Sequence, residues 1–145
     1  MITETLAEIL ADKLVALPTS ITRLEGEVLV PTPAKIRHRD IWDIVWLLSQ
    51  GTRLELDLVY RKIADYGINR YDVLLANALE TIHGIATGEV FKNQMQRFIT
   101  KSHHERAFGT PGYDEFMAAE VIKTLAMIKR HPAAVLTGAK PKAEP

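Results

Sequence analysis

The spacing of apolar residues constrains the fold of this chain more than any other feature. Over most of its 145 residues, apolar side chains recur every three or four positions, which places them on one face of a helix. The segments with this pattern are residues 5–17, 40–50, 55–66, 72–83, 89–101 and the stretch from 113 to about 130. Sustained helical signals joined by short connections predict an all-α bundle of five to six helices.

Residues that start and stop helices support these bounds. Thr5, followed three positions later by Glu8, has the form of a capping box at the start of the first helix, and Thr3 is the alternative cap. Pro18 is expected to end that helix, because proline has no backbone N–H to donate. Asp40 is a natural N-cap for the second helix, and Gly51 is placed to end it.

Two segments depart from the helical pattern. Residues 18–38 contain three prolines and one glycine around the β-prone run 28–30, which predicts a loop or a small β-hairpin between the first two helices. From residue 132 onward the composition changes to Ala, Gly, Lys and Pro, which have little to bury. We therefore expect one helical domain over residues 1–131 and a disordered tail over 132–145.

Composition excludes several classes of protein. Eighteen basic and eighteen acidic residues leave no net charge, and the chain has no cysteine for disulfides, thiol chemistry or a cysteine-ligated metal. No apolar run is long enough to span a bilayer, and Glu4, Glu8 and Asp12 argue against a secretory signal. The expected protein is soluble and cytoplasmic, without a membrane partner.

Aromatic and histidine residues give weaker signals. Trp42 and Trp46 lie four positions apart and are expected to pack in the core or at an interface. His103 and His104 are neighbours whose side chains would point about 100° apart on a helix, so they do not predict a metal site.

Lys13 has an unusual position for a charged residue. It lies beside the apolar stripe of the first predicted helix, next to Leu14 and one turn from Ile9 and Leu17. In one interpretation its methylene stem covers the core while its ammonium reaches water. In the other, the ammonium lies at the edge of a cleft and meets an anion such as a nucleotide phosphate.

The start of the second predicted helix is rich in charge. Asp40 and Asp43, three positions apart, lie on the same side of the helix. They either cap the helix and compensate its dipole, or they share a site with Lys13. In a shared site, the Asp40 carboxylate would orient the lysine or accept a proton, and Arg37 or Arg39 would bind phosphate.

These two segments together resemble a known family. Residues 8–17 read EILADKLVAL and residues 39–48 read RDIWDIVWLL. They are similar to the two C-terminal motifs of the AbiEii/AbiGii nucleotidyltransferase toxins, of the forms E-I-L-A-(E/D)-K-L-x-A-L and R-D-(L/I)-(Y/W)-D-(L/I). The two blocks, their order and the helical segments that follow extend the resemblance to about residue 130.

The resemblance implies a DNA-polymerase-β-like nucleotidyltransferase that acts as a toxin in a bacterial toxin–antitoxin or phage-defence system. Some members of the family add nucleotides to the 3′ ends of tRNA. Carried over to this sequence, the catalytic lysine and aspartate are Lys13 and Asp40, with Glu8, Arg39 and Asp43 as supporting positions.

The resemblance also implies that a part of the catalytic site lies outside this sequence. The family's Gly-Ser motif and metal-binding Asp-x-(Asp/Glu) pair precede the lysine helix, and this chain contains no Gly-Ser step. We therefore expect the chain to be inactive alone and to hold no metal itself. Mg²⁺ and a nucleoside triphosphate are expected only when an N-terminal half completes the site.

The expected partners follow from the same comparison. They are an N-terminal nucleotidyltransferase half or a cognate antitoxin, tRNA, and a second copy of the chain, since a missing half would expose apolar surface. The alternative function is a non-catalytic helical module that binds a partner protein. The retention of both Lys13 and Asp40 favours the first function.

Overall fold

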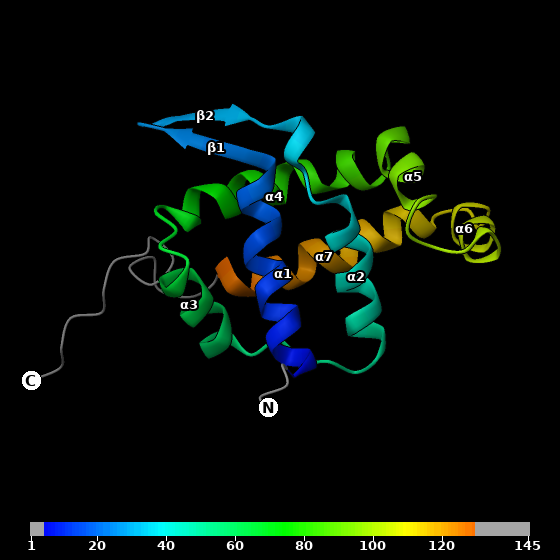
Figure 1. The fold of residues 1–145 in the computed structure, drawn as a ribbon, viewed down its shortest axis with the longest axis horizontal. Coiled ribbons are helices and arrows are strands. Elements are labelled where there is room, and N and C mark those ends of the chain that lie inside the picture. Colours follow the sequence, from blue (N-terminus) through cyan, green and yellow to red (C-terminus); the bar gives the residue numbers. More distant parts are fainter. Residues whose placement is uncertain (1–4, 130–145) are drawn as a thin grey trace, which may run out of the picture.

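The computed structural model describes residues 5–129, and over this range it is almost entirely helical (Figure 1). Its elements are α1 (Leu6–Ile21), β1 (Thr22–Glu25), β2 (Val28–Pro31), the 3₁₀ turn η1 (Pro33–Lys35), α2 (His38–Ser49), α3 (Leu56–Asp65), α4 (Tyr71–Ala86), α5 (Glu89–Met95), α6 (Lys101–Phe108) and α7 (Tyr113–Lys129). The predicted all-α class with a short hairpin within residues 18–38 is confirmed. The expected domain boundary at 131 and the tail 132–145 lie outside the described residues.

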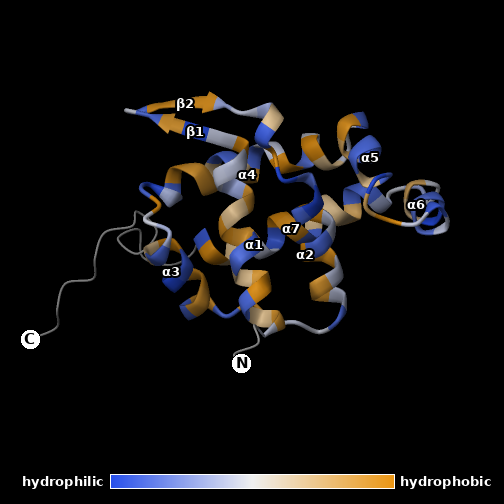
Figure 2. Cartoon of the chain, viewed as in Figure 1, coloured by the Kyte–Doolittle hydropathy of each residue, from blue (hydrophilic) through white to orange (hydrophobic). Residues whose placement is uncertain are grey.

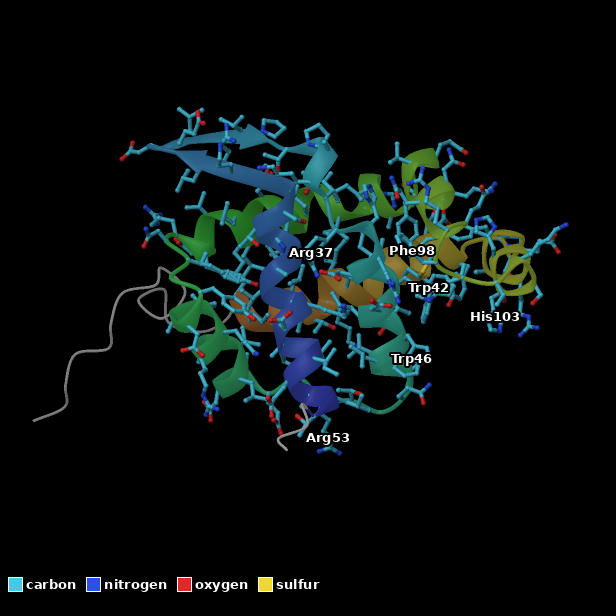
Figure 3. The ribbon with its side chains drawn as sticks, in the orientation of Figure 1. Arg37, Trp42, Trp46, Arg53, Phe98 and His103 are labelled. Atoms are coloured by element: carbon cyan, nitrogen blue, oxygen red, sulfur yellow. The ribbon has the colours of Figure 1, made fainter. Side chains whose placement is uncertain are left out.

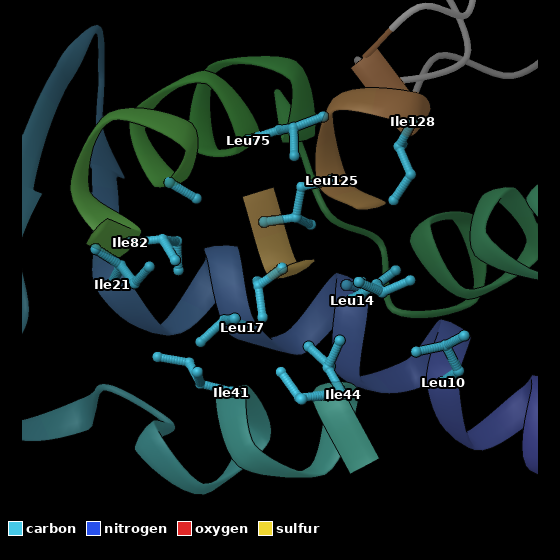
Figure 4. Close-up of a cluster of buried hydrophobic side chains, with 14 of the residues drawn as sticks. Leu10, Leu14, Leu17, Ile21, Ile41, Ile44, Leu75, Ile82, Leu125 and Ile128 are labelled. Carbon is cyan, nitrogen blue, oxygen red and sulfur yellow. The ribbon is translucent and has the colours of Figure 1, made fainter. Parts of the chain in front are cut away.

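Helix α1 is the centre of the bundle. It packs against α2, α3 and α4, and α4 in turn pairs with α7. Its Leu10, Leu14 and Leu17 are fully buried and meet the isoleucines of α2 and the leucines of α4 and α7 (Figure 4). Hydrophilic and hydrophobic bands alternate along α1, α2 and α3, as the spacing of the apolar residues in the sequence predicted (Figure 2). No helix within residues 5–129 is both long and apolar enough to cross a membrane.

The first helix does not end at Pro18, as the sequence suggested, but continues to Ile21. A proline within a helix removes the N–H that would bond to the carbonyl four residues earlier, here that of Leu14. The Tyr71 hydroxyl, from α4, donates a hydrogen bond of 2.7 Å to this carbonyl. The side chain of another helix thus satisfies the acceptor that the proline leaves free.

The predicted helix over residues 89–101 is wrong in extent, because α5 ends at Met95 and a separate helix, α6, follows. The chain forms a turn after α5, where the Phe98 N–H donates a hydrogen bond to the Met95 carbonyl. Thr100 then caps α6 by accepting a hydrogen bond from the His103 N–H. The bundle therefore has seven α-helices within the described residues, one more than the upper expectation.

The hairpin returns the chain to the place where it left α1. Thr22 pairs with Pro31 at its open end, and the Thr32 N–H donates to the Ile21 carbonyl at 3.0 Å. The Ser20 hydroxyl, at the end of α1, accepts a 3.1 Å hydrogen bond from the Arg37 N–H just before α2. The insertion between the helices therefore does not separate them, and α2 starts beside the end of α1.

The contact between Tyr71 and Leu14 gives a test of how α1 passes Pro18. Burial raises the pKa of the Tyr71 hydroxyl, which therefore remains a donor. Tyr71→Phe leaves the buried carbonyl without a partner and is expected to lower the free energy of unfolding by about 1–3 kcal/mol in urea denaturation. Tyr113→Phe, at a half-buried tyrosine, is the control and should have a small effect.

A second substitution separates this hydrogen bond from general packing. Pro18→Ala restores a backbone N–H that can reach the Leu14 carbonyl, so the cost of Tyr71→Phe should be smaller in that background. Equal costs in both backgrounds would show that the hydroxyl does not compensate for the proline.

Candidate functional site

The ammonium of Lys13 lies between two carboxylates of α2. Its Nζ is 3.2 Å from Asp40 Oδ1 and 3.1 Å from Asp43 Oδ2. Lys13 comes from the middle of α1 and both aspartates from the first half of α2. The expectation that Lys13 and Asp40 converge is confirmed. Of the two interpretations of Asp43, the structure agrees with the one that places it beside Lys13.

Asp40 is not the N-cap of the second helix, contrary to the sequence prediction. Helix α2 begins two residues earlier, at His38, and its N-cap is Arg37. The Asp40 carboxylate faces inward instead, where its side chain is only 4% exposed. Arg37 donates to it through Nε at 2.5 Å and through Nη2 at 3.5 Å. Two cations thus compensate one buried carboxylate, which would be costly to bury unpaired.

Lys13 is a cation held in a cleft and does not extend freely into water. Its side chain is 20% exposed. Partial burial acts to lower its pKa, but the attraction and hydrogen bonds of Asp40 and Asp43 outweigh this effect and raise the pKa above its ordinary value. Lys13 is therefore protonated at neutral pH, and its chemistry is that of a fixed positive charge.

Arg39 links Asp43 to the other side of the site. Its Nε is 3.5 Å from Asp43 Oδ2, and its guanidinium lies 5.0 Å from the centre of the Phe98 ring. Phe98 follows α5 and is 47% exposed. The four-residue and three-residue steps from Phe91 to Met95 and Phe98 would place the three on one side of the predicted helix 89–101. Because α5 ends at Met95, Phe98 is exposed whereas the other two are buried.

These residues surround a pocket of about 670 Å³. Its lining residues are Lys13, Pro33, Ala34, Ile36, Arg37, His38, Arg39, Asp40, Asp43, Val90, Gln94 and Phe98. Arg37 and Phe98 are both labelled in Figure 3.

Burial lowers the pKa of His38, so this residue is neutral at pH 7. With three cations against two carboxylates, the pocket has a positive balance.

The pocket has a charged wall and an apolar wall. The charged wall comes from α1 and α2, and the apolar wall comes from α5 and the turn after it, with Val90, Gln94 and Phe98. Reasoning from the sequence missed this second wall. Their four-residue spacing could have shown that the three residues share one side of the predicted helix, but no signal in the sequence places that side opposite Lys13.

The two aspartates do not form a magnesium site in this arrangement. Both carboxylates face the Lys13 ammonium, and Arg37 and Arg39 take further oxygen positions. A divalent cation would have to displace or repel these positive charges. Within residues 5–129, no group of three or more acidic or histidine side chains is arranged to hold a metal.

The remaining candidate residues lie apart from this cluster or have structural contacts. Glu8 belongs to the cap of α1, where its N–H donates to the Thr5 hydroxyl at 3.1 Å. Trp42 packs against Phe108, with ring centres 6.5 Å apart, as the packing interpretation predicted. The buried His104 lies with Nε2 3.0 Å from the Lys92 carbonyl.

Replacement of Lys13 by methionine tests the electrostatic role of this cluster. The variant is expected to lose on the order of 1–3 kcal/mol of unfolding free energy at neutral pH, because Asp40 loses one of its two cations. Since folding raises the pKa of Lys13 above 10.5, its contribution is complete below that pH and is lost as pH rises through the folded-state pKa.

Urea denaturation of both proteins across neutral and alkaline pH measures this difference. The difference in unfolding free energy between the native protein and Lys13→Met should narrow above about pH 10.5. Lys123→Met, at an exposed position of α7, is the control and should show no such difference. A difference that does not change with pH would contradict the assigned ion pairs.

Comparison with known proteins gives one match. A family model described as "Nucleotidyl transferase AbiEii toxin, Type IV TA system" matches residues 1–120. No curated protein and no solved structure matches the chain. The matched range contains both walls of the pocket.

Proposed function

The chain belongs to the AbiEii nucleotidyltransferase toxin family, and we propose that it supplies the helical half of a nucleotide-transfer site centred on Lys13 and Asp40. The observation that carries this proposal is the Lys13 ammonium, held by two aspartates at the wall of a pocket with a positive balance. A fixed cation in a partly buried site is the group that stabilises the charge of a transferring phosphate.

We assign the residues of the charged wall distinct roles. Lys13 contacts the phosphates of a nucleoside triphosphate, and Arg37 and Arg39, both about half exposed, approach the same phosphates from the rim. Asp40 is a positioning residue, because its carboxylate holds Lys13 and Arg37 in one orientation. Asp43 does the same for Lys13 and Arg39. Glu8 supports the site indirectly by stabilising the start of α1.

The apolar wall supports a nucleotide in preference to a simple polyphosphate. Phe98 presents its ring to the pocket with a guanidinium beside it, and base stacking on aromatic rings tolerates any base. Gln94 offers both a donor and an acceptor to the edge of a base. In this assignment the phosphates lie along α1 and α2 and the base lies against Phe98.

The metal-binding carboxylates of the reaction are proposed to come from an N-terminal half that carries the Gly-Ser and Asp-x-(Asp/Glu) motifs. The carboxylates at this site are engaged by cations and do not fit Mg²⁺. The acceptor is proposed to be tRNA or another RNA, and the place of action the cytoplasm. A toxin–antitoxin family implies a cognate antitoxin as a further partner.

The sequence predicted that a nucleoside triphosphate binds only when an N-terminal half completes the site, but the phosphate and base contacts proposed here come from residues of this chain. Ligand titration of the chain therefore tests the division of the pocket. We expect Lys13→Met to weaken binding of both ATP and inorganic triphosphate, because both depend on the phosphate contact. Phe98→Ala should weaken ATP by roughly tenfold and leave triphosphate unchanged, since only the base stacks. Isothermal titration calorimetry or backbone amide shifts in NMR measures both ligands.

Two variants serve as matched controls. Phe116→Ala removes a phenylalanine that is 50% exposed but lies on α7, outside this pocket, and should not affect ATP. Lys123→Met removes an exposed lysine of the same helix. If neither ATP nor triphosphate binds in a way that depends on Lys13, the proposed nucleotide site is wrong.

A labelling assay tests whether the chain is complete as an enzyme. The purified chain, incubated with tRNA, Mg²⁺ and radioactive nucleoside triphosphates, is expected to label no RNA. Addition of an N-terminal half with the missing motifs should restore labelling, and Lys13→Met should abolish it again. Efficient labelling by the chain alone would show that this chain supplies its own metal carboxylates.

One observation favours a second function, a helical module that binds a partner protein. Trp46 and Phe116 are 52% and 50% exposed and flank a pocket of about 210 Å³ between α2 and α7. An exposed aromatic pair of this kind is typical of an interaction surface, and an N-terminal half, an antitoxin or a second copy of the chain would each fit it. This function becomes the better one if no phosphate ligand binds at Lys13.

A further inference from the structure

A second pocket lies on the other side of η1, at the base of the hairpin and the start of α4. Its volume is about 520 Å³, and its lining includes Thr22, Arg23, Thr32, Lys35, Asn69 and Arg70. Figure 1 shows the hairpin beside α4, and β1 contacts that helix. None of its residues belongs to the pocket around Lys13.

The lining of this pocket contains three cations and no carboxylate. Arg23 comes from β1, Lys35 from η1 and Arg70 from the turn before α4. The two arginines have acidic partners, Glu25 and Asp72, but these partners do not line the pocket. No ion pair is recorded for Lys35 among the described residues.

The ion pair of Arg70 leaves part of its guanidinium available. Its Nε and Nη2 donate to the two carboxylate oxygens of Asp72 at 3.1 and 3.2 Å. A guanidinium has five N–H donors, so further donors remain for a ligand in the pocket. Asp72 thus orients the Arg70 side chain but occupies only two of its five donors.

Arg70 has an uncommon backbone conformation. Its φ of +57° lies in the left-handed region, and it is the only non-glycine residue within residues 5–129 with a positive φ. It is also the N-cap of α4, so the positive end of that helix dipole faces the same region. Residues held in such conformations gather at ligand sites, because the surrounding structure must enforce them.

A neutral donor completes the site. The Thr22 hydroxyl oxygen accepts a hydrogen bond of 3.4 Å from Asn77 Nδ2, which leaves its own hydrogen to donate. The Asn69 side-chain amide also lines the pocket. Glu25, Asp72 and Glu27 act on the two arginines from outside the pocket, and no carboxylate belongs to its lining. A lining of cations from three elements and uncharged donors is the feature of a phosphate site.

We propose that this pocket binds phosphate groups, supplied either by the backbone of a nucleic acid or by a free phosphate. The proposal does not depend on the role of Lys13. It extends the phosphate-binding surface across η1, because Pro33 and Ala34 line the first pocket and Thr32 and Lys35 line the second. A nucleic-acid strand bound along η1 would contact cations on both sides of this turn.

The test uses the full chain and a triple variant, Arg23→Gln, Lys35→Gln and Arg70→Asn. Asparagine tolerates the left-handed conformation, so the last substitution removes the charge and retains the backbone. One arm measures binding of a fluorescent single-stranded RNA of about ten nucleotides by anisotropy at several salt concentrations. The other arm follows backbone amide shifts around Thr32 and Arg70 during titration with inorganic phosphate.

Arg53→Gln is the matched control, because Arg53 is an exposed cation at the opposite end of the molecule from the hairpin (Figure 3). We expect the triple variant to lower RNA affinity by roughly tenfold or more and to reduce the slope of log affinity against log salt by about 2, as the loss of three phosphate contacts requires. The control should change neither value.

The outcomes separate the two sources and the two pockets. Loss of RNA binding in the triple variant identifies a nucleic-acid backbone, and loss of the phosphate-induced shifts without an RNA effect identifies a free phosphate. If neither ligand responds to the triple substitution, the proposal is overturned. The triple variant should leave Lys13-dependent binding of ATP and inorganic triphosphate unchanged, because Arg23, Lys35 and Arg70 lie outside that pocket. Failure of the nucleotide site is therefore recognised separately, by titration with those two ligands.

Discussion

The ion pairs of Lys13 with Asp40 and Asp43 connect the two helices on which the candidate site depends. The Asp40 carboxylate is almost fully buried, and a buried carboxylate is tolerated only when cations and hydrogen bonds replace water. Lys13 from α1 and Arg37 from the start of α2 supply both. The same contacts therefore stabilise the packing of α2 on α1 and place three cations along one wall of a pocket. The residues that hold α2 against α1 therefore include those to which we assign phosphate contacts.

The insertion between α1 and α2 allows this arrangement. A long connection between two helices usually leaves their relative position free, but an antiparallel hairpin begins and ends at the same place. Ser20 and Thr32 join its open end to the end of α1 through hydrogen bonds. The 3₁₀ turn η1 that follows separates the pocket around Lys13 from the one around Arg70. A chain without net charge thus gathers positive charge locally on both sides of one short turn.

Most of the helices could be predicted from the sequence, because each buries one face and the spacing of its apolar residues records that face. The cap of α1 by Thr5 was predictable for a similar reason, since it involves residues three positions apart. The continuation of α1 through Pro18 was not, because the donor that replaces the missing N–H is Tyr71, 57 residues after Leu14. The break between α5 and α6 was missed because Thr100, which caps α6, lies within a continuous helical pattern.

For the candidate site, the sequence by itself determined the residue types: a lysine beside an apolar stripe, a paired arginine and aspartate, and their similarity to the motifs of a nucleotidyltransferase family. It left open whether Lys13 reaches water or a partner, and whether Asp40 caps a helix or faces inward. Tertiary structure decided both, because α2 begins at His38 and turns the Asp40 carboxylate toward α1. It also decided that Phe98, Gln94 and Val90 face these charges across a pocket. Periodicity describes one helix at a time, whereas a pocket depends on how several helices are placed together.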